Sequence, residues 1–577
     1  MRINLYLISK IFLFTSLVTV LGVAGQNEQN ISSKEYPKPQ FPSYVVEPNS
    51  AEEVKVGVRG LVRNKSGYQG FGMGVVQQKE SMIIVPTANA EEMVVEGIRL
   101  ALEERGVEVY VLPDYQLVGI SRKSAMELIE AKKTYTGEHG FMEGANWINR
   151  VFPDPELAKQ WLKQRREDLY AKLFPPSREL PDHLKAVAQQ LTRRKVGLAI
   201  QKFLKGHPEI KSVFWGKGGA TGLRRALYPY DEKFGGVFTA DNRWEAMSQV
   251  GSYPADVWQL TEELTLESLA YVDRVEVTDP EGTDVWADIS QEQSEKWARG
   301  AYQRGHLYLF PNQATGRFGY SVVDYPAFQR EWLSREPIVR LNGTIAGTKG
   351  HGGFYPRWEV LLENGFITEV LGGGVYGELL REFLQYPGIN EMTYPYHQTP
   401  GFWYVYEVAL GSHPKYFRNP KILMEPGFSI GPERMAAGVI HWGLGIRVWH
   451  DPEAPKESRR WREFTTKHNL PMDHNFHTHT YFSTYRVHLR GAGRWISLVD
   501  KGHMSSLDNS EVRALASRYG DPDEVLHRDW VPEVPGINTS GRYGDYAANP
   551  WKYAKKVIDQ VVQGKYEHFY PSIKNTK

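Results

Sequence analysis

Apolar and polar positions between residues 81 and 113 predict a strand, a helix and a second strand. The run "SMIIVP" is continuously apolar, "EEMVVEGIRLALEE" places apolar residues on one helical face, and Gly106 closes that helix before "VEVYVL". A strand–helix–strand order is typical of a parallel α/β layer. The intervening turn lacks the glycine spacing of dinucleotide and P-loop sites, so we expect no phosphate cradle there.

The rest of the pattern predicts a domain order. Residues 53–270 form an N-terminal α/β domain, in which residues 121–210 are a charged helical insert. Short strands, glycines and aromatic residues predict a β-rich domain over residues 271–505, and residues 506–577 form a mostly helical C-terminal tail. The predicted fold class is an α/β N-terminal layer followed by a β-rich (α+β) C-terminal domain.

The N-terminus has the pattern of an export signal. "MRINLYLISKIFLFTSLVTVLGVAG" carries basic residues, then an uncharged apolar run that ends in small residues, which predicts a signal peptide over residues 1–25. The run is short for a membrane span, and an uncleaved N-terminal anchor is the alternative. Residues 26–52 are polar and Pro-rich, as in a linker. We therefore expect a secreted or periplasmic protein.

Charge and cysteine content narrow the function. The 577 residues include 69 basic and 68 acidic side chains, so no field of one sign favours nucleic acid or a membrane surface as a partner. We expect a small-molecule substrate, and homo-oligomerisation stays open. The absence of cysteine excludes disulfides, thiolate nucleophiles and thiolate metal sites. Any metal ion must therefore be held by histidine and carboxylate.

Three histidines lie close together in "MDHNFHTHTYF": His474, His477 and His479. Alternate residues of a strand point to the same side, so His477 and His479 could bind one metal ion together. A histidine-rich surface loop is the alternative explanation.

Two apolar strands supply further donors. Glu407 interrupts "YVYEVALG", where a buried carboxylate needs a salt bridge, hydrogen bonds or a metal ion. His441 interrupts "AAGVIHWGLG" and is either a ligand or a core histidine. Two histidines and one carboxylate on one face suit non-haem Fe(II), and the same residue types hold catalytic Zn(II).

Other stretches add or remove candidate chemistry. His351 in "GTKGHGGFYPRW" and His397 in "YPYHQTPGFWY" could act as an acid or base beside a substrate, or be ordinary loop residues. The sequence contains no G-x-S-x-G elbow and no H-E-x-x-H motif, so a serine hydrolase or a zincin protease has no support.

Several motifs recur together in a known order: "VEVTDPEGTDVWADI", "LYLFPNQATGRFGYS", "PIVRLNGTIAG", "EVLLENGFITEVLGGGVYGELLREFL", "YEVALG", "GVIHWGLG" and "FHTHTYF". In this order they resemble one superfamily, which contains the thermophilic metallo-aminopeptidases (the aminopeptidase T group) and the 2,5-dihydroxypyridine 5,6-dioxygenases. The resemblance covers roughly residues 265 to 505.

The aminopeptidases of this superfamily hold two metal ions with two Glu, two His and an Asp. The resemblance places one Glu at Glu407, one His at His441 and the H-x-D pair at His477 and His479, so an imidazole replaces the aspartate. The other Glu falls at Arg317, where a cation would repel a second ion. A two-metal site is therefore not expected.

The dioxygenases bind one Fe(II) with two histidines and one aspartate. By position these ligands become Glu407, His477 and His479, while His441 is a fourth ligand or acts on the substrate. From this resemblance, we expect His351 or His441 to transfer protons. We expect three aromatic residues to line the substrate pocket: Trp403, Tyr404 and Tyr406.

The leading hypothesis is thus an exported single-metal enzyme with Fe(II) favoured and Zn(II) or Mn(II) as alternatives. The resemblance implies oxidative cleavage of a small hydroxylated aromatic compound or N-heterocycle. Two alternatives stay open. One is a metal-dependent aminopeptidase or amidase, and the other is a non-catalytic binding protein on the same scaffold.

Overall fold

The computed structural model describes most of the chain and leaves several segments and both ends outside. The described residues are 36–40, 43–45, 48–63, 66–67, 70–71, 73–133, 144–145, 147–149, 152, 154–216, 236–239, 244, 253–299, 307–309, 340–350, 353–389, 405–415, 435–447, 463, 466–469, 473–563 and 568–570. The predicted signal peptide lies outside them.

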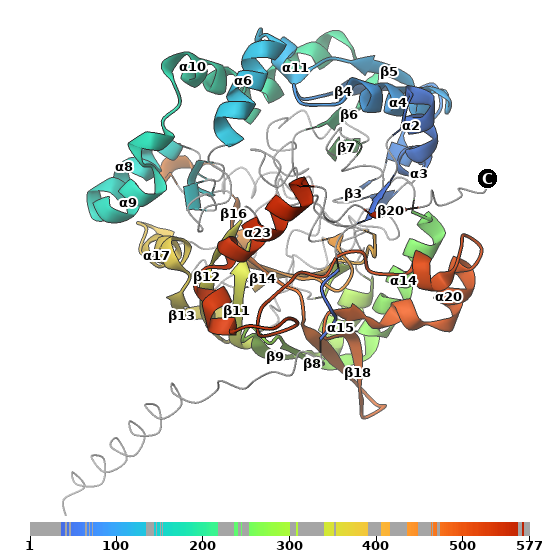
Figure 1. Ribbon diagram of the computed structural model, residues 1–577, viewed down its shortest axis with the longest axis vertical. Helices are drawn as coiled ribbons and strands as arrows, with labels where there is room; N and C mark the ends of the chain where they lie inside the picture. Colours follow the sequence, from blue (N-terminus) through green and yellow to red (C-terminus); the bar gives the residue numbers. More distant parts are fainter. Residues whose placement is uncertain are drawn as a thin grey trace, which may run out of the picture.

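A parallel four-stranded sheet forms the N-terminal unit, at the top of Figure 1. In spatial order its strands are β5 (Glu108–Val111), β4 (Ser81–Val85), β6 (Ile210–Trp215) and β7 (Gly236–Thr239). Residues of β4 alternate between two hydrophobic clusters, with Met82 and Ile84 in one and Ile83 and Val85 in the other. Helices cover both faces, which explains why this strand is continuously apolar.

The predicted unit of residues 81–113 is confirmed as strand, helix and parallel strand. Gly106 ends the turn after the helix with φ of 76°, a left-handed conformation that favours glycine. The helices on the cluster of Met82 are α2 (Ala51–Gly57), α3 (Arg59–Arg63) and α4 (Glu92–Glu103). The helices on the cluster of Ile83 are α5 (Asp114–Leu117), α6 (Arg122–Lys133), α10 (Asp182–Gln190) and α11 (Arg193–Gly206).

Two helices between residues 121 and 210 leave this layer and contact the β-rich unit. They are α8 (Pro155–Arg165) and α9 (Glu167–Leu173); α9 lies against α17 (Gly374–Phe383), and Arg165 at the end of α8 pairs with Glu382 of α17. Arg166 pairs with Glu378 at 2.8 Å, and Leu169 and Leu173 join the main hydrophobic core. The helical segment thereby connects the two halves of the molecule.

An antiparallel eight-stranded sheet dominates the second half. In spatial order its strands are β13 (Phe366–Gly372), β12 (Phe354–Glu363), β11 (Asn342–Lys349), β9 (Asp284–Asp288), β8 (Val272–Thr278), β17 (Thr484–Leu489), β18 (Arg494–Asp500) and β19 (His503–Met504). Burial alternates along β9, where Val285 and Ala287 are buried and their neighbours are exposed. One face therefore meets the core and the other meets solvent.

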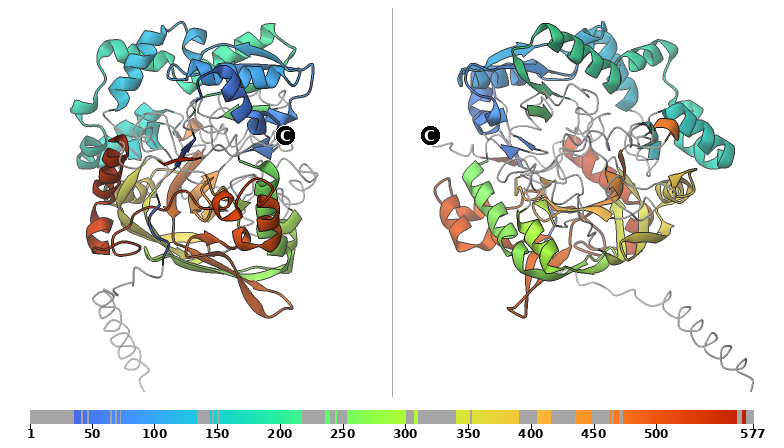
Figure 2. Two further views of the ribbon diagram at one scale, coloured as in Figure 1. Left: turned by 45° about the vertical axis from the view of Figure 1, so that its right-hand side comes forward. Right: turned by 180° about the vertical axis from the view of Figure 1, so that it is seen from behind.

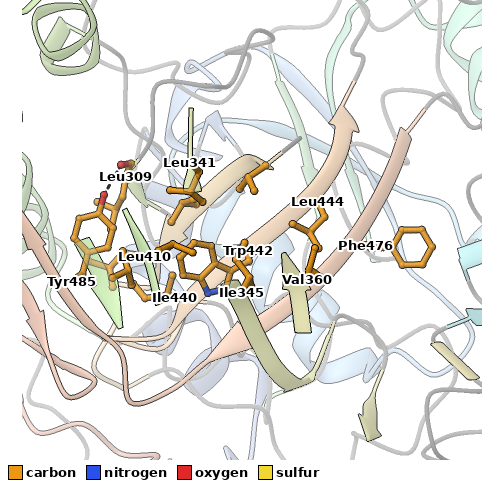
Figure 3. Packing of buried hydrophobic residues seen from close by; sticks show 14 of the residues in the cluster. Leu309, Leu341, Ile345, Val360, Leu410, Ile440, Trp442, Leu444, Phe476 and Tyr485 are labelled. Carbon is orange, nitrogen blue, oxygen red and sulfur yellow. Dashed lines mark hydrogen bonds between the residues drawn. The ribbon is translucent and has the colours of Figure 1, made fainter. Parts of the chain in front are cut away.

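A smaller antiparallel sheet packs on the buried face of the large one. Its strands are β10 (Leu307–Tyr308), β14 (Val405–Leu410), β15 (Ile440–Arg447) and β16 (Asp473–Thr480). Figure 3 shows Trp442 and Leu444 of β15 beside Ile345 and Val360 of the large sheet. This packing uses one face of the small sheet and leaves the alternate residues of its strands on the other face.

The C-terminal part is helical and lies against the β-rich unit, as both views in Figure 2 show. Two contacts bring the ends of the described chain together: Gln40 bridges to Val531, and β1 (Ser43–Val45) pairs in parallel with β20 (His568–Tyr570). Within the described residues, the remaining α-helices of five or more residues are α14 (Ala255–Leu266), α15 (Gln291–Arg299), α20 (Ser510–Ala516), α22 (Tyr543–Ala548) and α23 (Pro550–Val562).

The predicted fold class, an α/β layer followed by a β-rich α+β unit, is confirmed. Among the residues that the structure describes, we find no helix with the length and apolar character needed to cross a membrane. The domain boundaries themselves stay predictions.

Candidate metal centre

Strands β14, β15 and β16 bring the predicted donors onto one face of the small sheet. The antiparallel register aligns Glu407, Gly443 and His477 in one row across the three strands. The next row, two residues along, contains His441 directly opposite His479. Because side chains alternate along a strand, all four titratable side chains project from the same face. Segments more than 30 residues apart in sequence thus contribute to one group.

Glu407, His441 and His477 converge on a small volume. The carboxylate Oε2 of Glu407 lies 3.4 Å from Nε2 of His441 and 3.5 Å from Nε2 of His477. One donor atom from each residue can be chosen so that all three lie within 4.8 Å of one another. Ligand atoms about 2.1 Å from one ion are about 3.0 to 3.4 Å apart, depending on the coordination geometry. The two carboxylate–imidazole separations, 3.4 and 3.5 Å, lie at and just above the upper end of this spacing.

All three side chains are fully buried, with 0% of each exposed. A carboxylate removed from water is costly unless a positive charge or hydrogen bonds compensate it. A divalent cation between Glu407 and the two imidazoles would supply that charge. The donor chemistry also fits, because carboxylate oxygen and neutral imidazole nitrogen are ordinary ligands of first-row divalent metals. The residues present therefore fit a single metal ion.

His479 occupies a different place from the one that the resemblance implies for it. Its Nε2 lies 2.9 Å from Nδ1 of His441, within hydrogen-bonding distance, and its side chain is 0% exposed. In the three-donor group, His441 takes the position that the resemblance gives to His479. His441 and His479 share a row, but His441 lies on β15, next to the strand of Glu407, whereas His479 lies on β16, two strands away from Glu407.

Aromatic hydroxyls from the large sheet and α17 hold the backbone of β16. The hydroxyl of Tyr355 donates to the carbonyl oxygens of His477 at 2.9 Å and Lys349 at 3.0 Å. The amide of His477 donates to the hydroxyl of Tyr376 at 3.3 Å. Both peptide groups that flank the His477 side chain are therefore anchored from outside their own sheet.

Several predicted site residues lie outside the described residues. These are His351, Trp403 and Tyr404, together with Arg317 and His397. Tyr406 is a backbone member of β14, and His474 of β16, but their side chains are not among those described. The predicted pocket wall, the second-metal question at Arg317 and the role of His351 accordingly stay predictions.

Gly443 was not predicted as a site residue, although it lies between two of the donors. A glycine within an apolar strand marks a place where something approaches the backbone closely, and that signal was present in "HWGLG". Gly443 is buried and its φ is not positive, so its role is to omit a side chain rather than to adopt a special backbone conformation. It leaves room between Glu407 and His477.

Comparisons with known proteins find distant similarity to solved structures. No protein-family model matches the chain, and no curated protein matches it. Among solved structures, 2,5-dihydroxypyridine dioxygenase from Pseudomonas putida KT2440 aligns with a TM-score of 0.35 and 12% identity, over 79% of this chain and 98% of that one. A likeness at this level carries no argument for a shared activity, which must be judged from the site itself.

Proposed function

We propose that this protein is a mononuclear metal-dependent enzyme whose ion is held by Glu407, His441 and His477. One observation carries the proposal: a carboxylate and two imidazoles, each fully buried, bring donor atoms within 4.8 Å of one another. Buried carboxylates and imidazoles gathered in one place are typical of metal and catalytic sites.

We further propose that the ion is Fe(II) and the reaction an oxidative cleavage of a small hydroxylated aromatic compound or N-heterocycle. Two histidines and one carboxylate with open positions form the ligand set of non-haem Fe(II) oxygenases. The order of motifs described above, which resembles the dihydroxypyridine dioxygenases, supports the same class. When bound, Fe(II) would supply a redox-active centre with open coordination positions.

The protein's own residues have defined tasks in this proposal. Glu407 supplies the negative charge, His441 and His477 supply neutral nitrogen donors, and Gly443 leaves space above the sheet. The buried setting limits water and strengthens the electrostatic attraction between the ion and Glu407. Tyr355 and Tyr376 hold β16 so that His477 keeps its position. Export to the periplasm or outside the cell is part of the proposal and rests on the N-terminal sequence alone.

The test is metal content, measured by mass spectrometry on protein purified without air. Wild type is compared with Glu407→Gln, His441→Ala and His477→Ala, and with His503→Ala as a matched control. His503 is exposed and pairs with Asp508 at 2.8 Å, away from the small sheet. We expect about one iron per chain in wild type and in the control, and a loss of at least about tenfold in occupancy in the other three variants.

Activity then separates the chemical classes. Oxygen uptake with hydroxylated aromatic compounds, abolished in His477→Ala, would support the oxidative reaction. Two zinc or manganese ions per chain with hydrolysis of peptide substrates would replace it with the aminopeptidase alternative. Wild-type protein that takes up no iron, zinc or manganese while circular dichroism shows it folded would overturn the metal site altogether.

A further inference from the structure

We propose that His479 is a positioning residue: it accepts the Nδ1–H of His441 and so directs the Nε2 lone pair of His441 at the ion. This inference rests on the proposed metal function. It assigns His479 a task different from direct ligation, and it predicts one specific arrangement of protons on the two imidazoles.

The geometry places the two rings in a defined contact. His441 and His479 are direct cross-strand partners, their ring centroids are 4.8 Å apart, and Nδ1 of His441 lies 2.9 Å from Nε2 of His479. Both side chains are fully buried. In a low-dielectric interior a hydrogen bond of this kind is strong, and losing it leaves a buried polar atom unsatisfied.

The two nitrogens of His441 face different groups. Nε2 lies 3.4 Å from Oε2 of Glu407, and Nδ1 lies 2.9 Å from Nε2 of His479. A nitrogen that binds a metal must carry a lone pair, and a neutral imidazole has one N–H. The proton of His441 must then sit on Nδ1, which donates to Nε2 of His479. His479 in turn must carry its own proton on Nδ1.

The reverse arrangement would block ligation. If Nε2 of His479 carried the proton, it would donate to Nδ1 of His441, and the single proton of a neutral His441 would then sit on Nε2, which could not offer a lone pair to the ion. The hydrogen-bond partner of Nδ1, the His441 nitrogen that does not bind the ion, therefore decides whether His441 is a ligand, as is usual for metal-bound histidines. A neutral imidazole does this here without adding a second negative charge to the site.

Direct ligation by His479 through the same nitrogen competes with this hydrogen bond. The donor group that the described residues form contains Glu407, His441 and His477, whose atoms lie within 4.8 Å of one another. His479 contacts this group through His441. His479 lies beside the donor His441 and two strands away from Glu407, which is the place of a residue that orients another residue.

The experiment compares two substitutions in the full-length chain. His479→Gln can place an amide oxygen near the position of Nε2, whereas His479→Leu has similar bulk and no acceptor. Affinity is measured as Zn(II) and Co(II) competition with a coloured chelator. We expect His479→Gln to stay within about threefold of wild type and His479→Leu to bind about 10- to 100-fold more weakly. His488→Leu is the control, because His488 lies on β17 of the large sheet, outside the donor group, and pairs there with Asp273 at 2.6 Å.

A spectroscopic measurement tests the proton arrangement directly. In zinc-loaded protein labelled with ¹⁵N-histidine, His441 is assigned by the signals lost in His441→Gln, and His479 likewise. We expect a proton on Nδ1 of both His441 and His479 and, of these two rings, metal perturbation only at Nε2 of His441. Metal perturbation at Nε2 of His479, or a proton there, would overturn the inference even if the substitutions also affected folding.

The outcomes separate this inference from the proposed function. Wild-type protein that binds neither ion overturns the metal function and the positioning role together. Tight binding by wild type with equal affinities for His479→Gln and His479→Leu overturns the positioning role alone and leaves the metal function standing.

Discussion

Gly443 shows how a single residue shapes the candidate metal centre. It is paired with Glu407 on one side and His477 on the other, so any side chain there would rise between the two donors. Its backbone is compatible with alanine, unlike that of Gly445, which has φ of 104°. Glycine at position 443 therefore matters because it lacks a side chain and leaves space at the site, not because of its backbone conformation.

We predict that Gly443→Ala weakens metal binding with little effect on strand conformation. The new methyl group would occupy volume between Glu407 and His477 and displace the ion from its donors. We expect about a 10-fold or larger loss of Zn(II) affinity in chelator competition, comparable with losses from disturbed metal surroundings. Gly544→Ala is the control, because a Cβ at Gly544 meets nothing within 4 Å. Unchanged affinity in Gly443→Ala would place the ion elsewhere.

At the scale of elements, the end of β14 is fastened to the C-terminal segment by a buried ion pair. Lys415, five residues beyond β14, lies 3.1 Å from Asp529, and the two side chains are 3% and 1% exposed. The amide of Asp529 also donates to the carbonyl of Pro414 at 3.0 Å. Burial raises the pKa of the Asp529 carboxyl to about 7, while the Lys415 ammonium opposes that rise. The strand that carries Glu407 thus depends on the C-terminal part.

We predict that Lys415→Met lowers the free energy of unfolding by about 3 to 5 kcal/mol, because it leaves Asp529 buried without its cation. The double variant Lys415→Met with Asp529→Leu should recover most of that loss, since neither charge is then buried. Urea denaturation measures both. The exposed pair of Lys555 and Asp559 is the control: Lys555→Met should change stability by less than about 1 kcal/mol. Equal losses in the single and double variants would contradict the prediction.

At the scale of the whole molecule, a buried pair of carboxyls joins parts that are distant in sequence. Asp279, after β8, accepts from the amide of Phe482 at 3.1 Å and the hydroxyl of Ser483 at 2.9 Å. Glu281 accepts from the hydroxyl of Thr348 at 2.9 Å and that of Tyr543 at 3.2 Å. The large sheet, the segment after β16 and the C-terminal helices therefore meet at one turn.

The pair predicts a pH dependence of stability. Burial raises the pKa of both carboxyls, and the negative charge of Asp279 raises that of Glu281 further. A raised folded-state pKa contributes stability that is fully present below the unfolded pKa, about 4, and is lost as pH rises through the folded value. We therefore expect the contribution of this pair to fall between mildly acidic and slightly alkaline pH.

Glu281→Gln tests this dependence. The amide oxygen can still accept from Thr348 and Tyr543, but the side chain no longer titrates and no longer repels Asp279. The free energy of unfolding, measured by urea at about pH 5 and about pH 8 with metal removed by chelator, should fall less in Glu281→Gln than in wild type. An unchanged or larger fall would show that these carboxyls do not titrate as described.

Part of this organisation follows from local sequence patterns. The continuous apolar run of β4 predicted a strand buried on both faces, and the helical spacing after it predicted α4, because periodicity reports burial within one element. Likewise, Glu407 and His441 stood out because polar groups in apolar strands need a partner, and the histidine cluster stood out because its three imidazoles lie close together in sequence. The alternation of a strand also put His477 and His479 on one face.

By itself, then, the sequence determined the class of each element, the two-part α/β and β-rich plan, and the kinds of donor that a metal site could use. The tertiary structure alone decided how those donors combine. The antiparallel register places Gly443 between Glu407 and His477 and sets His441 against His479. A shift by two residues would keep every side chain on its face and yet change every pairing, so local periodicity cannot specify it. Register depends on contacts between segments far apart in the chain, and these form only when the sheet is assembled.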